Sequence, residues 1–203
     1  MGNELNCVAR IDGKRERGKA LLETSELIFR GAQCRVKIRF SEMSGVEARD
    51  GELRIKTKDA VFGFAVGQAA EKWREKILHP KTRLEKLGVK AGMGVEVIGE
   101  PDLEFAKELG QSRAVTEKGN AKPGASLVFW FVEGKNALHA LGKVRKKLTG
   151  ATGLWVVYAK GKKEMTELDV LNAGRKAGLK DVKVVGFSAT HTALKFVIPV
   201  EKR

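Results

Sequence analysis

Residues 94–110, GVEVIGEPDLEFAKELG, combine an apolar strand, a tight turn and an amphipathic helix. This layout is typical of a nucleotide-binding corner, in which glycines let backbone N–H groups approach a phosphate at the start of a helix. Only Gly99 remains of that glycine pattern. Glu100, Asp102 and Glu104 place carboxylates around the first helical turn, where each stabilises the helix by about 0.3–1 kcal/mol. We therefore expect a structural turn that repels phosphate.

A cofactor without phosphate would meet less repulsion at this corner. Glu117 stands 18 positions after Gly99, near the place where an acid holds ribose hydroxyls in nucleotide-binding corners. An S-adenosylmethionine site at Gly99, Glu100 and Glu117 stays open as an alternative. Our first expectation is that no cofactor binds.

Two lysine- and arginine-rich segments are candidates for binding an anionic ligand. The segment YAKGKKEMTE follows a strand and carries Lys160, Lys162 and Lys163, and ligands of open α/β sheets bind at the edge where strands end. The segment DGKRERGK, residues 12–19, is expected to be a hairpin loop that presents Arg15 and Arg17. A solvated loop is the plainer interpretation of both segments.

Thr166 and Asp169 are spaced as a helix cap, which predicts a helix start just after the lysine-rich segment.

The residues of acid–base and metal chemistry are sparse. His79, His139 and His191 are spread along the chain, and only His191 is expected near the ligand edge. No nucleophile motif and no metal-ligand spacing is present, so no catalytic residue and no metal site are predicted. Cys7 and Cys34 stand 27 positions apart without a second pair and are expected to be reduced structural thiols.

The first half of the chain has the period of β-strands. In QCRVKIRF, the apolar Cys34, Val36, Ile38 and Phe40 alternate with basic residues, which predicts a strand with one buried face. Asp-Gly at residues 50–51 predicts a hairpin turn. The expected strands cover 5–11, 18–23, 26–30, 33–40, 43–49, 51–57 and 60–66.

After Gly67 the period becomes helical. QAAEKWREKIL puts Ala70, Trp73 and Ile77 on one face. Seven antiparallel strands closed by one helix, with one tryptophan aimed at the barrel, resemble the pleckstrin-homology-like fold over roughly residues 4–78. That resemblance implies that basic residues of the first hairpin, here Arg15 and Arg17, contact an acidic headgroup.

The second half alternates helices with strands, the pattern of a parallel sheet. Pro101 suits the first helical position and Gly110 the residue after the helix end. The last two strands are separated by only a short turn, so they must form an antiparallel hairpin. A parallel sheet that ends in such a hairpin is the plan of the methyltransferase-like variant of the Rossmann fold. The expected strands cover 94–98, 113–117, 126–132 and 153–159, and the expected helices cover 82–88, 101–109, 135–148 and 166–177.

The second half also resembles a bacterial family of unknown function with that fold. The matching segments span nearly all of residues 82–199 and are LGVKAGMGVEVIG, GLWVVYAK, TELDV, GLKDVKV and LKFV. The chain departs from the family pattern at Ala159, His191 and Thr192. The family implies a fold and no chemistry.

We therefore expect two domains, α+β overall. Residues 1–79 form a seven-stranded antiparallel pleckstrin-homology-like barrel capped by one helix. Residues 80–203 form a Rossmann-like α/β domain with a terminal antiparallel hairpin.

Charge and composition limit the function. The net charge is +14, and the longest apolar run, residues 125–132, is too short for a membrane helix. The N-terminus lacks a secretory pattern, so we expect a cytoplasmic protein. Basic residues exceed acidic ones by 4 through Pro80 and by 10 afterwards, which favours a protein or other acidic partner for the second half.

Three functions follow from these observations. The first is a non-catalytic binding or scaffold protein with a degenerate methyltransferase-like domain. The second is an S-adenosylmethionine-dependent methyltransferase with a diverged cofactor site. The third is a nucleic-acid-associated protein, which is not favoured because Trp130, Trp155 and Tyr158 all fall within buried strand runs.

Overall fold

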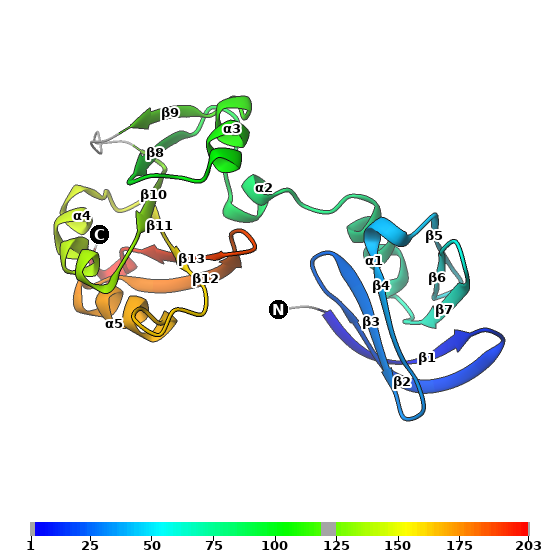
Figure 1. The fold of residues 1–203 in the computed structure, drawn as a ribbon. Helices are drawn as coiled ribbons and strands as arrows, with labels where there is room; N and C mark the ends of the chain where they lie inside the picture. The colour runs from blue at the N-terminus through cyan, green and yellow to red at the C-terminus, as the bar shows by residue number, and fades with distance from the viewer. Residues whose placement is uncertain (1–2, 119–124, 203) are drawn as a thin grey trace. The chain divides into compact units, whose positions relative to one another are not determined.

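The structure is a computed structural model that describes residues 3–118 and 125–202 (Figure 1). The chain divides into two compact units, Met1–Lys81 and Thr82–Arg203. Each unit contains its own sheet and its own buried apolar core, and each is described by itself below. No helix within the described residues is long and apolar enough to cross a membrane.

The N-terminal unit is a single curled antiparallel sheet in the order β4-β3-β2-β1-β7-β6-β5 (Figure 1). The strand β1 pairs with β2 along its whole length but with β7 only at residues 9–11, so the sheet bends at β1. The strands are β1 (Asn3–Ile11), β2 (Lys14–Leu22), β3 (Glu26–Gly31), β4 (Arg35–Arg39), β5 (Gly45–Arg49), β6 (Glu52–Lys56) and β7 (Val61–Ala65).

One helix, α1 (Ala69–Leu78), closes this unit. Ala70, Trp73 and Ile77 are its buried residues, as the helical period predicts, and they join the core formed by the inner faces of the strands. Trp73 is 1% exposed and is among the largest fully buried side chains. A short 3-10 turn, η1 (Phe40–Glu42), follows β4.

Two predicted features of this unit are corrected. The segment at residues 12–19 is not a loop, because the chain turns within Asp12 and Gly13 alone, both at positive φ, and β2 already begins at Lys14. Asp-Gly is the preferred pair for such a two-residue hairpin. The strand expected over residues 33–40 is shorter, and Cys34 lies before it in the turn. Asp50 and Gly51 form the predicted second hairpin turn, also at positive φ.

The C-terminal unit is a six-stranded mixed sheet in the order β12-β13-β11-β10-β8-β9. The pairs β9–β8, β8–β10 and β10–β11 are parallel, whereas β13 runs antiparallel to both β11 and β12. The terminal antiparallel hairpin is therefore confirmed. The strands are β8 (Gly94–Ile98), β9 (Val115–Lys118), β10 (Leu127–Val132), β11 (Gly153–Ala159), β12 (Lys180–Gly186) and β13 (His191–Val197).

Helices cover both faces of this sheet, which explains why its central strands are apolar without alternation. In β10, Val128 and Trp130 pack in one core cluster with residues of α4 and α5, while Leu127 and Phe129 pack in the other with residues of α2 and α3. The sequence of a strand that is buried on both faces is a continuous apolar run. The helical segments are α2 (Arg83–Leu87), α3 (Leu103–Gln111), η2 (Lys135–Ala140), α4 (Leu141–Lys147), α5 (Glu167–Lys176) and the terminal turn η3 (Val200–Lys202).

The helix boundaries differ from two expectations. Asp102 is the N-cap of α3, whose first helical residue is Leu103, so Pro101 precedes the cap and Gly110 lies inside the helix. A carboxylate that accepts a backbone N–H makes the stronger start signal. The helix expected over residues 135–148 is divided into the 3-10 segment η2 and the short α4.

Candidate functional site

The carboxyl ends of β8, β10 and β11 meet at one edge of the C-terminal sheet, because these strands are parallel. Gly99, Glu133 and Lys160 are the residues that follow the three strands. His191, the first residue of β13, pairs with Ala159 at the end of β11. This edge is where ligands of open α/β sheets bind.

Gly99 makes the sharp exit from β8. Its φ is +84°, and a Cβ atom built there would lie 2.8 Å from the carbonyl oxygen of Phe131 on the neighbouring strand. Both the left-handed backbone and the close approach require glycine. Gly99 and the following Glu100 are exposed.

The start of α3 is satisfied by the chain itself. The carboxylate of Asp102 accepts a hydrogen bond from the backbone N–H of Phe105 at 2.7 Å. The same carboxylate faces the guanidinium of Arg83 at 3.2 Å. An anion that approached this helix end would meet a carboxylate in place of free donors.

Arg83, on the first turn of α2, is the side chain that joins these elements. It donates to Glu108 at 2.9 Å as well as to Asp102, and its guanidinium lies 5.4 Å from the ring centre of Phe105 and 4.9 Å from that of Phe187. Its side chain is only 12% exposed. Burial alone would lower the pKa of Arg83, but Glu108 and Asp102 together raise that pKa above its ordinary value.

Sequence reasoning did not find Arg83. The residue has no motif of its own, and its partners lie 19 and 25 positions further along the chain. Thr82 and Glu85 form a capping box that starts α2, and that spacing was the one local sign that this short helix has a fixed position.

The acid proposed for the ribose position is only partly described. Glu117 lies in β9, where its backbone pairs in register with Glu96 of β8. Its side chain lies outside the described residues.

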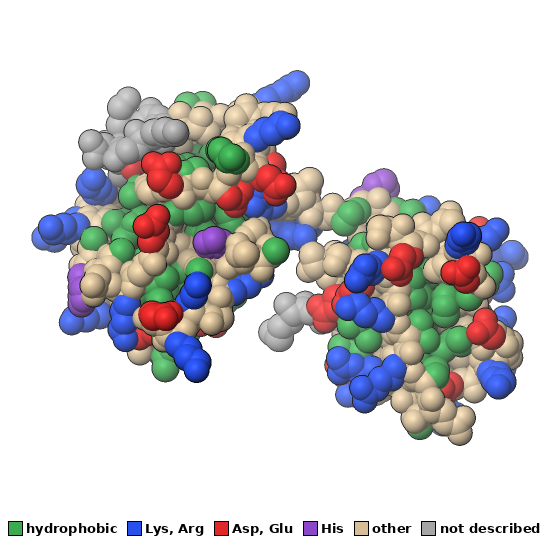
Figure 2. Space-filling model, viewed as in Figure 1, with side chains coloured by type: hydrophobic (Ala, Val, Ile, Leu, Met, Phe, Trp, Pro, Cys, Tyr) green, Lys and Arg blue, Asp and Glu red, His purple; other side chains and the backbone are tan. Residues whose placement is uncertain are grey.

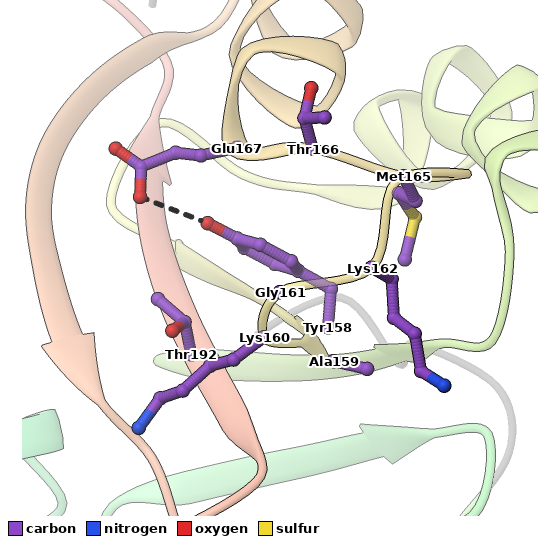
Figure 3. A pocket seen from close by; sticks show the side chains of 9 residues that line it. All are labelled: Tyr158, Ala159, Lys160, Gly161, Lys162, Met165, Thr166, Glu167 and Thr192. Atoms are coloured by element: carbon purple, nitrogen blue, oxygen red, sulfur yellow. Dashed lines mark hydrogen bonds between the residues drawn. The ribbon is translucent and has the colours of Figure 1, made fainter.

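A pocket of about 240 Å³ lies beside the carboxyl end of β11 (Figure 3). Lys160 and Lys162, both predicted from the sequence, line it, whereas Lys163 is not among its lining residues. Tyr158 and Thr192 contribute from β11 and β13, and Glu167 from the start of α5. With Thr166, which also lines it, the pocket combines two amines, three hydroxyls and a carboxylate.

Some polar groups of this pocket already form hydrogen bonds within the protein, and others do not. The hydroxyl of Tyr158 donates to Glu167 at 3.2 Å, the contact drawn as a dashed line in Figure 3. Burial raises the pKa of Tyr158, and the adjacent Glu167 carboxylate raises it further. The amine of Lys160 donates to the backbone oxygen of Ser188 at 2.7 Å. Among the described residues, no carboxylate forms an ion pair with Lys162.

The helix α5, whose first residues line the pocket, starts as predicted. Thr166 accepts from the backbone N–H of Asp169, and the carboxylate of Asp169 accepts in return from the backbone N–H of Thr166 at 2.9 Å. Lys135 adds an ion pair to Asp169 at 2.6 Å. The hydrogen bond from Lys135 and those from Thr166 lower the pKa of Asp169 to about 2.

The remaining sequence candidates belong to other elements, with the exception of His191. Arg15 and Arg17 are exposed on the strand β2. His79 follows α1 with a 77% exposed side chain, and His139 is exposed. His191 does lie at the ligand edge, where its Nδ1 is 2.9 Å from the hydroxyl of Thr190. No group of three or more potential metal ligands occurs within the part of the chain that the structure describes.

The strand order decides the fold class of this unit. The last strand, β13, is inserted antiparallel between β11 and β12 in an otherwise parallel sheet. The C-terminal unit has a methyltransferase-like Rossmann fold. Solved structures that are similar to the chain include several methyltransferases. An S-adenosylmethionine-dependent methyltransferase from Aquifex aeolicus is 15% identical, covers 57% of this chain and 87% of its own, and has a TM-score of 0.41.

Two further methyltransferases give comparable values. A TehB-like enzyme from Corynebacterium glutamicum is 13% identical over 64% of this chain and 96% of its own, with a TM-score of 0.38. An O-methyltransferase from Thermotoga maritima is 7% identical over 96% and 93%, with a TM-score of 0.44. Such low identities and scores transfer no activity, and the strand order alone carries the fold assignment. No family model and no curated protein sequence matches the chain, so its resemblance to a bacterial family of unknown function stays a prediction.

Proposed function

We propose that this chain is a non-catalytic binding protein whose methyltransferase-like unit does not hold the adenosyl cofactor. The start of α3, where the cofactor cleft of such a fold begins, is engaged by Asp102 and Arg83. This pairing is the observation that carries the proposal. A cofactor carboxylate or phosphate would have to displace both an N-cap and a guanidinium that is held by two carboxylates and two rings.

The pocket beside β11 is the place where we propose that this unit binds a ligand. Lys160 and Lys162 bring positive charges and Thr192 a hydroxyl, while Tyr158 and Glu167 are joined by a hydrogen bond. These groups favour a small anionic group close to Lys162. The carboxylate of Glu167 restricts that group to one side of the pocket.

The N-terminal unit is proposed to be pleckstrin-homology-like. Its antiparallel strand order with one closing helix agrees with that fold, and Trp73 packs into the sheet as that resemblance implies. Together, the two units suit a protein that presents surfaces to partners. The two units are also proposed to be separate domains, divided near residues 79–82.

An S-adenosylmethionine-dependent methyltransferase is the second candidate. Gly99 keeps the glycine geometry of a cofactor corner, and the sulfonium of this cofactor is positive, so Glu100 would not repel it. This candidate needs Glu100 and Glu117 to contact the cofactor.

Thermal unfolding of the full chain separates the two candidates. A ligand at a hundred times its dissociation constant adds about 2.7 kcal/mol to the free energy of unfolding. We expect S-adenosylhomocysteine to leave the unfolding midpoint unchanged. A midpoint that rises with concentration, and does not rise in Glu117→Ala, would establish a working cofactor site and favour the methyltransferase alternative instead.

A further inference from the structure

Five cations occupy neighbouring outward positions on the N-terminal sheet. The alternation of β2 turns Arg15, Arg17 and Lys19 toward solvent. Arg30 on β3 lies opposite Lys19 in register, and Arg35 on β4 lies opposite Arg30. We call these five residues the basic sheet face.

The register sets like charges directly against each other. Lys19, Arg30 and Arg35 form one row across three strands, and opposed cations in a sheet destabilise the fold. Neighbouring strands lie about 4.8 Å apart, so the repulsion acts at close range. An arrangement of this kind is relieved when an anion binds over the row.

The sheet supplies one carboxylate near this row: the pKa of Glu4 is lowered by Lys19 and, to a smaller extent, by Arg30. Lys19 is held by Glu4 at 2.7 Å. Within residues 3–118 and 125–202, no carboxylate forms an ion pair with any of the four arginines of the basic sheet face. Elsewhere on the same sheet, carboxylates do pair with cations, as Glu26 does with Lys37 and Glu52 with Arg10.

The chemistry and spacing of these cations fit a chain of phosphates. Arginine binds phosphate oxygens through two parallel N–H donors. Same-face residues along β2 recur about every 7 Å, so the cations extend both along one strand and across three. Arg17 and Lys19 also line a groove of about 630 Å³ together with Asn6 and Val8.

We propose that the basic sheet face binds double-helical nucleic acid through its phosphate backbone. The outward residues of β1–β4 include no aromatic side chain, and single strands are held mainly by stacking on such rings. Contacts to phosphates alone make the binding independent of base sequence. The proposal concerns the N-terminal unit and does not rest on the state of the cofactor cleft.

An anionic bilayer is the competing partner. Peripheral proteins that lie on membranes insert apolar side chains into the lipid. The large apolar side chains that the structure exposes in this unit are Val61 and Leu78, and neither belongs to β1–β4. The outward apolar side chains of β1–β3, Val8, Leu21 and Ile28, are half-buried. The basic sheet face therefore offers a bilayer charge and little apolar surface to insert.

Fluorescence anisotropy with a labelled duplex of mixed sequence, measured with the full chain over a series of salt concentrations, tests this proposal. Five phosphate contacts predict a slope of log K against log salt concentration of about −4.5. The variant Arg17→Gln/Arg35→Gln should weaken binding by about tenfold or more and make the slope shallower by about 2. A second variant, Arg15→Gln/Arg30→Gln, should do the same.

The matched control removes the same charge from the last turn of α4, as Arg145→Gln/Lys146→Gln. We expect this variant to bind the duplex almost as the unmodified chain does. Equal weakening in the control would reduce the effect to net charge and overturn the proposal. Absence of duplex binding, or tighter binding to phosphatidylcholine vesicles that contain phosphatidylserine, would overturn it as well. Unfolding midpoints that are no lower than that of the unmodified chain confirm that each of the three variants is folded.

Discussion

Arginine serves two different purposes in the two units. In the C-terminal unit, Arg83 is 12% exposed and lies between two carboxylates and two aromatic rings. In the N-terminal unit, the arginines of the basic sheet face are exposed, and Arg30 and Arg35 stand opposite other cations. The first arrangement holds the fold together, whereas the second leaves charge available for a partner.

This difference shows that charge totals do not locate a binding surface. The second half of the chain carries most of the net positive charge. Its buried Arg83, however, is already paired with two carboxylates of the same unit. The first half is closer to neutral, but strand alternation places five of its cations on one face of the sheet. The position of each charge relative to its neighbours decides whether it can act on a partner.

The largest expected effect tests whether the two units are independent. Trp73→Ala removes a side chain that is 1% exposed in the N-terminal core and should lower the free energy of unfolding by about 3–5 kcal/mol. Because each unit has its own core, calorimetry should show that only one of two transitions shifts. A joint shift of both transitions would show that the units unfold together and would weaken the comparison.

Removal of Arg83 should have the second-largest effect on stability. Arg83→Ala should destabilise the C-terminal unit by about 2–3 kcal/mol, since it leaves Asp102 and Glu108 facing each other and removes two ring contacts. The matched substitution Arg17→Ala on the basic sheet face should change stability by less than about 0.5 kcal/mol. Chemical denaturation of both variants measures the difference, and equal effects would contradict the contrast between the two arginines.

The corner after β8 should tolerate no side chain. Gly99→Ala combines a φ of +84° with a contact of 2.8 Å to the oxygen of Phe131, which together should cost about 2 kcal/mol. Gly92→Ala is the matched control, because its φ is +75° but a Cβ would meet nothing within 4 Å. Its cost should be about 1 kcal/mol. If the two variants were equally stable, the close approach of β8 and β10 would have no energetic role.

The start of α5 should show a defined pH dependence. The pKa of Asp169 is lowered to about 2, so its stabilising effect is present above the ordinary aspartate pKa of about 3.9 and is lost as the pH falls through 2. Asp169→Asn should therefore be less stable than the unmodified chain near neutral pH. The gap in unfolding midpoint should narrow as the pH falls from about 4 to about 2. A gap that is constant over this interval would exclude the carboxylate as its source.

The pocket offers a direct spectroscopic probe, because Tyr158 is the single tyrosine of the chain. Burial and Glu167 raise the pKa of its phenol, so its ultraviolet titration should begin above the ordinary value of about 10. In the Glu167→Gln variant, the phenol of Tyr158 should ionise at a lower pH than in the unmodified chain. Its pKa should still exceed that of free tyrosine, because burial is the larger cause of the shift. The raised pKa also means that stability from this group is present below pH ~10 and is lost at higher pH. Identical titrations of the two proteins would show that Glu167 does not contact the Tyr158 hydroxyl.

Local patterns were sufficient to predict most elements of the fold. The alternation around Val36 and Ile38, the helical spacing of Ala70 and Trp73, and the short connection of the last hairpin each reflect contacts within a few residues or one face. The predicted loop at residues 12–19 was wrong because a run of charges was interpreted as solvated loop, although the two-residue turn needs only Asp12 and Gly13.

The candidate site was less accessible to sequence reasoning. The acidic start of α3 was predicted, but its partner Arg83 is brought there by tertiary packing from another helix. Likewise, the basic sheet face depends on the register of three strands, which no single segment encodes. Both features involve residues that are distant in sequence, and no spacing rule reports such contacts.

The account rests on the claim that Asp102 and Arg83 close the corner after β8 to an adenosyl cofactor. Backbone amide resonances of Gly99, Glu100, Asp102 and Leu103, followed by heteronuclear NMR as S-adenosylhomocysteine is added to the full chain, test it most directly. We predict that these resonances do not move at any ligand concentration. Saturable shifts at Gly99 and Glu100, accompanied by shifts at Glu117, would contradict the claim and identify a working cofactor site.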